Sequence, residues 1–471
     1  MVACAAAISA AACRDGWITD PIDSQAAGAV IVSNPVPAAA AAAAAGALGG
    51  TFSVGALPST VAYVSLPPGT ATAAAVAGVV NPRLGLAAST AVVDGGFDPI
   101  AIAAAEGDTL ELTLRDPEGR TLMEYRAPVE RSRPPVVVRT SPPPRKRDVP
   151  LYTVAAVVFS EPIDSATING ASMLLRRGGE PVPGTLLVGE RDGTSVAFLP
   201  DDALQPNTSY ELVITTAVRD LDGDALPAPV VVEFTTASAT PQSPDGPSIL
   251  IDASRDGGAW WYPQWAQEGG FDPELDHQGK ALAEYFRSRG FAVVELPRPY
   301  TITAELLAGH DFVIRASGFG GYLAGEIAAY REYVEAGGQL LLLGDHMMHL
   351  PADELAESLG VRFAAITRGE NVIDRYTAHP LTEGLDTLYY GVGSGVVAHP
   401  ASAQILGWLS EDSYLDLNKN SVFDEGEPTS PPVFGVMPLG AGRIVFFGDV
   451  NTFNWVPQPL VDNLLAFLAS P

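Results

Sequence analysis

The stretch that decides the fold of the C-terminal half is GEIAAYREYVEAGGQLLLLGD, residues 325–345. It begins with an amphipathic helical pattern, breaks at two glycines and continues as an unbroken apolar run that ends in Gly-Asp. A run of this kind is typical of a parallel strand buried on both faces. The same alternation of apolar runs and helical stretches recurs after residue 248, with strand-like runs at 248–253, 291–296, 311–317 and 442–449 and helical stretches at 275–290 and 457–469. We therefore expect residues 248–471 to form an α/β domain with a doubly wound parallel sheet.

Upstream of this domain the pattern changes to short strands separated by explicit turns. Residues 109–114 (TLELTL) alternate with period two before the turn Asp-Pro-Glu-Gly. Such spacing predicts a β-sandwich over 51–130 and a second one over 134–237, joined to the last domain by a linker at 238–247. Residues 14–50, with eight consecutive alanines, read as a low-complexity tether. The expected fold is therefore multidomain, with two all-β Ig-like sandwiches followed by the α/β domain.

The second sandwich carries a recognisable pattern. It contains VAAVVFSEPID (154–164), FLPDDALQPNTSYELVIT (198–215), VRDLDGDAL (218–226) and VEFTT (232–236). This resembles the bacterial Ig-like domain first described in S-layer proteins, although Asp224 stands where that family usually has Asn. The resemblance implies a spacer or adhesive module of an exported protein rather than an enzyme.

The last domain resembles divergent members of the class I glutamine amidotransferase-like superfamily, which has a flavodoxin-like fold. The matching stretches are ITAELLAGHDFVI (302–314), EYVEAGGQLLLLGDH (332–346), TAHPLTEGL (377–385) and GAGRIVFFGDVNTF (440–453). The family's chemistry needs a cysteine nucleophile after a strand, but this domain contains no cysteine. Glutamine hydrolysis by that mechanism is excluded, so the resemblance implies a pseudoenzyme.

Composition limits the partners and the location. Lys and Arg number 27 against 55 Asp and Glu, a net charge of −28, which argues against nucleic acid as a partner. The two cysteines, Cys4 and Cys13, lie in the apolar segment 1–13, which resembles a lipoprotein signal with Cys13 as the lipidation site but has no basic residues before the apolar run. No later apolar run is long enough to cross a membrane. We expect an exported protein of the bacterial cell envelope or outer surface, with a lipid anchor at Cys13 or an ordinary cleaved signal.

Candidate site residues cluster at the predicted carboxyl ends of strands, where open α/β sheets bind ligands. Asp252, Asp345, His346 and Asp449 are the catalytic candidates, and Asn451 follows the last strand. The aromatic run Trp260, Trp261, Tyr262 and Trp265 could stack on a sugar ring or a peptide, or could fold back as an apolar lid. His346 and His349 share a helical face, which is a weak signal for a metal site.

The most specific chemical motif is DLNKNSVFDEGE, residues 416–427. Its oxygen ligands have the spacing of an EF-hand calcium loop: Asp416, Asn418, Asn420, the Val422 carbonyl, Asp424 and Glu427. Ser421 replaces the glycine usual at the sixth position, and prolines follow the loop, so paired EF helices are not expected. The sequence predicts a structural calcium ion here, with an ion-free Asn/Asp turn as the alternative.

These features favour an exported protein, lipid-anchored at Cys13, whose β-modules present a non-catalytic domain that binds a glycan or a surface protein. The alternative is a hydrolase that uses Asp252, Asp345, His346 and Asp449, with or without a metal ion. A purely architectural role is the third reading of the same sequence.

Overall fold

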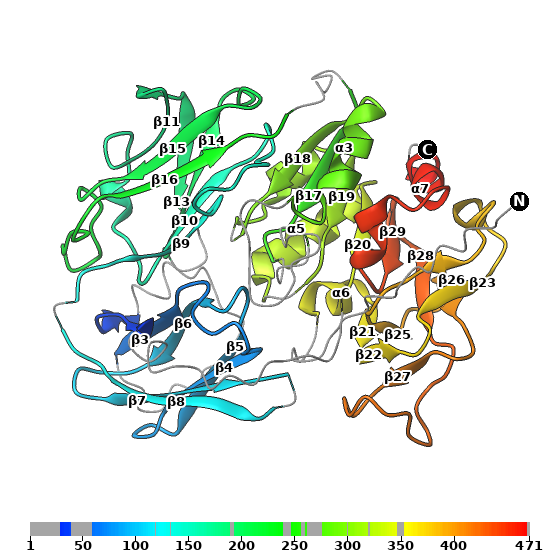
Figure 1. The fold of residues 1–471 in the computed structure, drawn as a ribbon, viewed down its shortest axis with the longest axis horizontal. Coiled ribbons are helices and arrows are strands. Elements are labelled where there is room, and N and C mark those ends of the chain that lie inside the picture. The colour runs from blue at the N-terminus through cyan, green and yellow to red at the C-terminus, as the bar shows by residue number, and fades with distance from the viewer. Residues whose placement is uncertain are drawn as a thin grey trace, which may run out of the picture.

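A computed structural model describes most of the chain (Figure 1). The described residues are 29–38, 59–117, 119–131, 133–188, 193–238, 246–255, 260, 276–298, 300–318, 321–345 and 353–468. Cys13, Trp261, Tyr262, Trp265 and His346 lie outside this set, so the predictions made for them are not addressed by the structure. Within the described part of the chain, no helix has the length and apolarity needed to cross a bilayer.

The N-terminal module contains two four-stranded antiparallel sheets. One has the order β1 (Ile31–Val32), β3 (Thr60–Leu66), β2 (Val36–Pro37), with β6 (Phe97–Ala103) also paired to β3. The other has the order β5 (Leu86–Ala91), β4 (Val76–Asn81), β7 (Thr109–Arg115), β8 (Thr121–Pro128). Alternate residues of β7 are buried, so Leu110, Leu112 and Leu114 join Val64 in one core.

The middle module also has two four-stranded antiparallel sheets. The first has the order β13 (Gly184–Val188), β14 (Ser195–Pro200), β10 (Ala155–Phe159), β9 (Val137–Ser141), and the second β12 (Glu180–Pro181), β11 (Met173–Arg177), β15 (Ser209–Ile214), β16 (Val230–Thr235). A short 3₁₀ helix, η1 (Ser165–Thr167), follows β10. Tyr210 stacks on Phe234 with ring centroids 5.8 Å apart inside the shared core.

The C-terminal domain is built on one nine-stranded mixed sheet (Figure 1). Its parallel part has the order β18 (Ala292–Leu296), β17 (Ser248–Asp252), β19 (Phe312–Arg315), β20 (Gln339–Leu343), β29 (Gly442–Phe447). The antiparallel part continues with β28 (Pro432–Leu439), β26 (Gln404–Leu409), β23 (Val372–Tyr376) and β24 (Leu388–Tyr389). Two small sheets pair β21 (Arg362–Ala364) with β25 (Gly395–Ala398) and β22 (Ile366–Arg368) with β27 (Tyr414–Asp416).

The expected fold class is therefore wrong, because the chain is mostly β and its C-terminal sheet is mixed rather than doubly wound and parallel. Residues between β20 and β29 add antiparallel strands. β28 runs directly into β29 through a tight turn at Gly440, where φ is +61° and an added Cβ would lie 2.5 Å from Glu335 Cα. A hairpin this short can only join antiparallel strands, since a parallel pair needs a long crossover.

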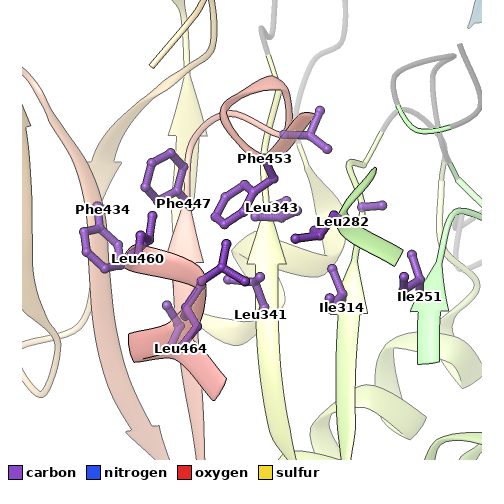
Figure 2. Close-up of a cluster of buried hydrophobic side chains, with 14 of the residues drawn as sticks. Ile251, Leu282, Ile314, Leu341, Leu343, Phe434, Phe447, Phe453, Leu460 and Leu464 are labelled. Atoms are coloured by element: carbon purple, nitrogen blue, oxygen red, sulfur yellow. The ribbon is translucent and has the colours of Figure 1, made fainter. Parts of the chain in front are cut away.

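Helices cover both faces of the nine-stranded sheet. α3 (Lys280–Ser288) and α7 (Leu460–Leu468) pack on one face, and α4 (Ala304–Ala308), α5 (Ala324–Glu335) and α6 (Glu354–Leu359) on the other. Figure 2 shows Leu282 and Leu460 over strand residues such as Leu341. Leu340 and Leu342 face the opposite core, which explains the unbroken apolar run of β20. Each such buried side chain contributes about 1.5–3 kcal/mol.

A buried charge cluster joins the middle module to the C-terminal domain. The His277 imidazole lies between two carboxylates, with Nδ1 2.8 Å from Asp148 Oδ2 and Nε2 3.0 Å from Glu295 Oε1. Lys146 pairs with Asp148, and Arg287 Nη2 lies 2.8 Å from Glu295 Oε2. Val154 of the middle module joins the core beneath α5, and its neighbour Thr153 bonds the Glu295 carbonyl at 3.2 Å. The middle module and the C-terminal domain are therefore joined by apolar packing and by buried ion pairs.

The His277 contact predicts a pH-dependent stability. Burial opposes the imidazolium, but hydrogen bonds and charge from Asp148 and Glu295 raise the pKa of His277 above its usual 6.5. A raised pKa means that this stabilisation is full below about pH 6.5 and is lost as the pH rises through the folded-state pKa. We expect urea midpoints of the parent to fall between pH 6 and pH 9, and those of His277→Gln to change less. Parallel pH profiles for the two proteins would contradict this role.

Candidate functional site

Asp252, the last residue of β17, is fully buried and held by protein groups. Its Oδ2 accepts hydrogen bonds from the hydroxyls of Tyr330 (2.5 Å) and Tyr322 (3.1 Å), and its Oδ1 from the Ser254 main-chain N–H (2.8 Å). Burial first and the Asp252 charge second raise the pKa of both tyrosines well above the usual value. The tyrosines therefore stay protonated and serve as donors to Asp252.

The neighbouring strand end carries a buried ion pair. Arg315, the last residue of β19, makes a two-pronged contact with Asp353, with Nη1–Oδ1 2.9 Å and Nη2–Oδ2 2.6 Å. Both side chains are buried. Asp353 Oδ1 also accepts from the Ala356 main-chain N–H and so caps the start of α6. This ion pair connects the carboxyl end of β19 to the start of α6, although Arg315 and Asp353 are 38 residues apart in the sequence.

A second buried ion pair completes this group. Arg255 Nη2 lies 2.5 and 2.6 Å from the two carboxylate oxygens of Glu326. Glu326 also accepts from the main-chain N–H groups of Ile302 (3.0 Å) and Leu323 (2.8 Å), the latter at the start of α5. Buried charges are tolerated when they are paired in this way. The polar groups at this end of the sheet thus hold one another and the surrounding chain.

Asp345 and Asp449 follow the adjacent strands β20 and β29 and form a separate group. Both are buried, and Asp449 accepts from the Asn451 main-chain N–H (3.1 Å) and the Thr452 hydroxyl (3.3 Å). After burial, their charges raise the pKa of Tyr390 well above its usual value. Gly393 packs so closely that an added Cβ would lie 2.5 Å from Asp449 Cβ. The segment at 390–394 therefore closes over these strand ends.

The three described catalytic candidates thus divide between two groups, with Asp252 bonded to Tyr322 and Tyr330 and the other two beside Tyr390. Among the residues that the structure describes, no three His, Cys, Asp or Glu side chains are close enough together to hold a metal ion. A hydrolase mechanism with all four candidates in one cluster gains no support from this arrangement. His346 lies outside the described residues.

Trp260 does not present its ring to a ligand. It is 1% exposed, lies in the core with Leu282 and Phe286, and donates from Nε1 to Glu295 Oε1 at 3.0 Å. Gly279 packs against it so tightly that an added Cβ would lie 2.0 Å from the indole ring. Of the two alternatives for the aromatic run, the burial of Trp260 fits an apolar lid, whereas stacking of Trp261, Tyr262 and Trp265 on a ligand stays a prediction.

A different pair of aromatic side chains is exposed on this domain. Tyr389 and Trp455 are 52% and 53% exposed, and their rings meet edge to face with centroids 5.8 Å apart. Beside Trp455 lie carboxamides: Asn454 Nδ2 donates to Gln278 Oε1 at 2.6 Å and approaches Asn451 Oδ1 at 3.5 Å. We call the set Tyr389, Trp455, Asn451, Asn454 and Gln278 the aromatic platform. Of these five residues, the sequence predicts only Asn451 as a ligand contact. Trp455 lies four residues later in the 3₁₀ helix η3 (Asn451–Trp455), and its position after the same strand is the signal that could have identified it.

The loop at 416–427 is folded around its first and last acidic residues. Asp416 is fully buried at the end of β27 and accepts from the main-chain N–H groups of Asn420 (3.0 Å) and Ser421 (2.8 Å). Glu427 accepts from those of Leu417 (2.8 Å) and Asp424 (3.0 Å). The Leu417 contact brings the twelfth position of the loop beside the second.

Ser421 adopts the conformation for which EF-hand loops usually use glycine. Its φ is +62°, in the left-handed region, and its hydroxyl accepts from Arg368 Nη2 at 2.7 Å. The sharp turn at the sixth position therefore forms without glycine. The amide groups of Asn418 and Asn420 both donate to Asp424 Oδ2 at 2.7 Å. Their oxygens accept from the main chain, Asn418 Oδ1 from the Asn420 N–H at 3.1 Å and Asn420 Oδ1 from the Val422 N–H at 2.8 Å.

One family model matches part of the chain. Residues 131–236 match the family model described as the bacterial Ig-like domain, which confirms that resemblance for the middle module. No curated protein matches the chain. These comparisons give no support to an amidotransferase-like C-terminal domain.

Similar solved structures include the mmIFT52 N-terminal domain, at 15% identity and TM-score 0.36, covering 48% of this chain and 98% of that one. A cytoplasmic protein from Salmonella typhimurium is 13% identical with TM-score 0.32, covering 47% and 98%. The S-layer protein rSbsC is 21% identical with TM-score 0.18, covering 23% of this chain and 14% of that one. Scores this low assign no function to the chain.

The ion pair at the β19 strand end gives a direct stability test. Arg315→Met removes the cation and leaves Asp353 buried without it, which should cost about 3–5 kcal/mol of unfolding free energy. Arg315→Met combined with Asp353→Asn should be more stable than Arg315→Met alone, because no unpaired charge is left. Urea unfolding monitored by tryptophan fluorescence measures both. A cost below about 1 kcal/mol for Arg315→Met would show that the pair does not stabilise the domain.

Proposed function

We propose that the protein is an exported bacterial surface protein whose C-terminal domain binds a carbohydrate at the aromatic platform. The bacterial Ig-like domain at 131–236 fits a cell-surface protein. In this proposal the N-terminal and middle modules hold the C-terminal domain away from the membrane, with lipid attachment at Cys13 as the anchor. A surface protein as ligand of the same platform is the alternative partner.

The observation that carries this proposal is the half-exposed Tyr389–Trp455 pair beside three carboxamide side chains. Tyr and Trp side chains are enriched at binding interfaces, because an apolar ring and a polar group are combined in one side chain. The electron-rich face of an aromatic ring attracts the C–H groups of a sugar ring, and carboxamides both donate to and accept from its hydroxyls. The platform offers both kinds of contact at one edge of the domain.

The polar groups at the carboxyl ends of β17 and β19 support a binding role for the domain rather than a catalytic one. Arg315, Arg255 and Asp252 are each buried and each hydrogen-bonded to side chains of the same domain. A catalytic acid or base must reach its substrate within hydrogen-bond distance. Groups buried and paired in this manner are better suited to holding the fold than to reacting with a ligand.

The platform predicts which substitutions abolish binding. Trp455→Ala and Tyr389→Ala should each weaken binding of a sugar identified on a glycan array by at least about tenfold, because an aromatic contact at the centre of a site contributes about 2 kcal/mol or more. Isothermal titration of the intact protein with that sugar measures the loss.

The matched control is Phe423→Ala, which removes a ring that is 51% exposed in the 416–427 loop. It should bind the sugar as the parent does. Equal affinity of parent, Trp455→Ala and Tyr389→Ala would refute the platform. Binding of a surface protein, but of no glycan, that is lost in both variants would instead establish the alternative partner.

We also propose that calcium holds the 416–427 loop. Asp416, Asn418, Asn420, the Val422 carbonyl, Asp424 and Glu427 supply only oxygen ligands, which suits this ion. The contact of Glu427 with Leu417 and the left-handed Ser421 support the proposal. Among the described residues the three acids do not already lie together as a metal site, so in this proposal they close around the ion when it binds. Bound calcium would rigidify the exposed loop between β27 and β28 and would have a structural role, not a catalytic one.

Lys419 makes this proposal easy to test, since trypsin cleaves after lysine and Lys419 is exposed inside the loop. About 5 mM CaCl₂, above the affinity of about 0.1–1 mM usual for extracellular calcium modules, should slow cleavage after Lys419 markedly in the parent. Asp416→Ala should lose this protection, whereas Asp412→Ala, an exposed acid just before the loop, should keep it. Mass spectrometry of the fragments measures both rates. Cleavage that calcium does not slow in the parent would contradict an ion in the loop.

A further inference from the structure

Two buried carboxylates of the middle module each have an oxygen atom without a partner. Glu161 and Asp220 are both 2% exposed. Within the described part of the chain, Glu161 Oε1 and Asp220 Oδ2 are buried and make no hydrogen bond. Such an atom costs about 1–3 kcal/mol, and more when it is charged, so a fold retains it only when something else compensates.

Local structure brings the two carboxylates together. Ile163 and Asp220 form an antiparallel bridge, and the Asp164 main-chain N–H donates to the Arg219 carbonyl at 2.9 Å. Residues just after β10 therefore run alongside the turn at 219–225. Asp220 Oδ1 is used inside that turn, where it accepts from the N–H groups of Asp222 (2.9 Å) and Asp224 (2.8 Å). Its other oxygen is left for a different partner.

The electrostatic surroundings of Glu161 are negative. After burial, the charges of Asp220, Asp222 and Asp224 raise the pKa of Glu161 to about 8, opposed by a hydrogen bond from the Asn34 main-chain N–H. Burial also raises the pKa of Asp220. This contrasts with Asp353 and Glu326, whose buried carboxylates each contact an arginine. Glu161 and Asp220 therefore combine unpartnered buried oxygens with negative surroundings, which a cation would neutralise.

We propose that a hard divalent cation, Ca²⁺ or Mg²⁺, binds between Glu161 Oε1 and Asp220 Oδ2. The site requires only two carboxylates, with water and main-chain oxygens completing the shell, as both ions accept. Asn34 belongs to the segment between β1 and β2 of the N-terminal module, and its side-chain oxygen also accepts from the Arg133 N–H at 2.9 Å. The ion would therefore sit at the joint between the N-terminal and middle modules and stiffen it.

The test uses the full chain carrying Asp416→Ala, so that the 416–427 loop does not contribute. Titration with CaCl₂ and with MgCl₂ should show one bound ion, and adding Glu161→Gln or Asp220→Asn should lower its affinity at least tenfold. Adding Asp202→Asn, an exposed acid of the same module, should leave the affinity unchanged.

Thermal unfolding in EDTA separates an ion site from a merely structural carboxylate. Glu161→Gln should be at least as stable as the parent without ions, since a neutral amide replaces a buried unpaired acid, and should no longer be stabilised by added ions. A large loss of stability of Glu161→Gln in EDTA would overturn the proposal. So would the absence of ion binding to the Asp416→Ala protein, or undiminished binding after Glu161→Gln is added.

Discussion

The contact of His277 with Asp148 and Glu295 decides how the middle module meets the C-terminal domain. His277 lies just before α3, Glu295 lies in β18, and Asp148 comes from the middle module, so one imidazole joins three parts of the chain. Glu295 also accepts from Trp260 and Arg287, and its carbonyl bonds Thr153. A residue buried among so many charges is stable only if every partner is in place. The Ig-like domain is thereby attached to the C-terminal domain through a continuous buried contact.

Elsewhere in the C-terminal domain, burial distinguishes the polar groups that hold the fold from the aromatic residues that we propose bind a ligand. At the carboxyl ends of β17 and β19, Asp252 and Arg315 are buried, with Asp252 hydrogen-bonded to Tyr330 and Arg315 paired with Asp353. At the aromatic platform, Tyr389 and Trp455 keep half of their surface in solvent. Burial of the first group costs desolvation free energy that its hydrogen bonds and ion pair offset, whereas the second group retains an apolar surface that a ligand can still bury. This difference is the physical basis for proposing a binding module.

Sequence patterns predicted the parts of the fold that depend on local periodicity. β17, β19, β20 and β29 were visible as apolar runs because both of their faces are buried, and α5 because its pattern ends at Gly337 and Gly338. The antiparallel strands β28, β26 and β23 were missed, since strand direction depends on the connections rather than on residue type. The burial of Trp260 depends on Glu295, and the platform joins residues 66 positions apart, so neither follows from neighbouring residues. By contrast, the acids of the 416–427 loop lie within twelve residues, and their spacing was readable.

In the proposed function, the C-terminal domain binds a sugar at the aromatic platform through the exposed surface of Tyr389 and Trp455. Hydrogen–deuterium exchange of the full chain, with and without a saturating glycan ligand, tests it most directly because it locates the contact without a substitution. We expect slower exchange confined to the segments around 388–395 and 449–456. Protection that maps to another surface, or no change at a ligand concentration that saturates binding, would contradict it.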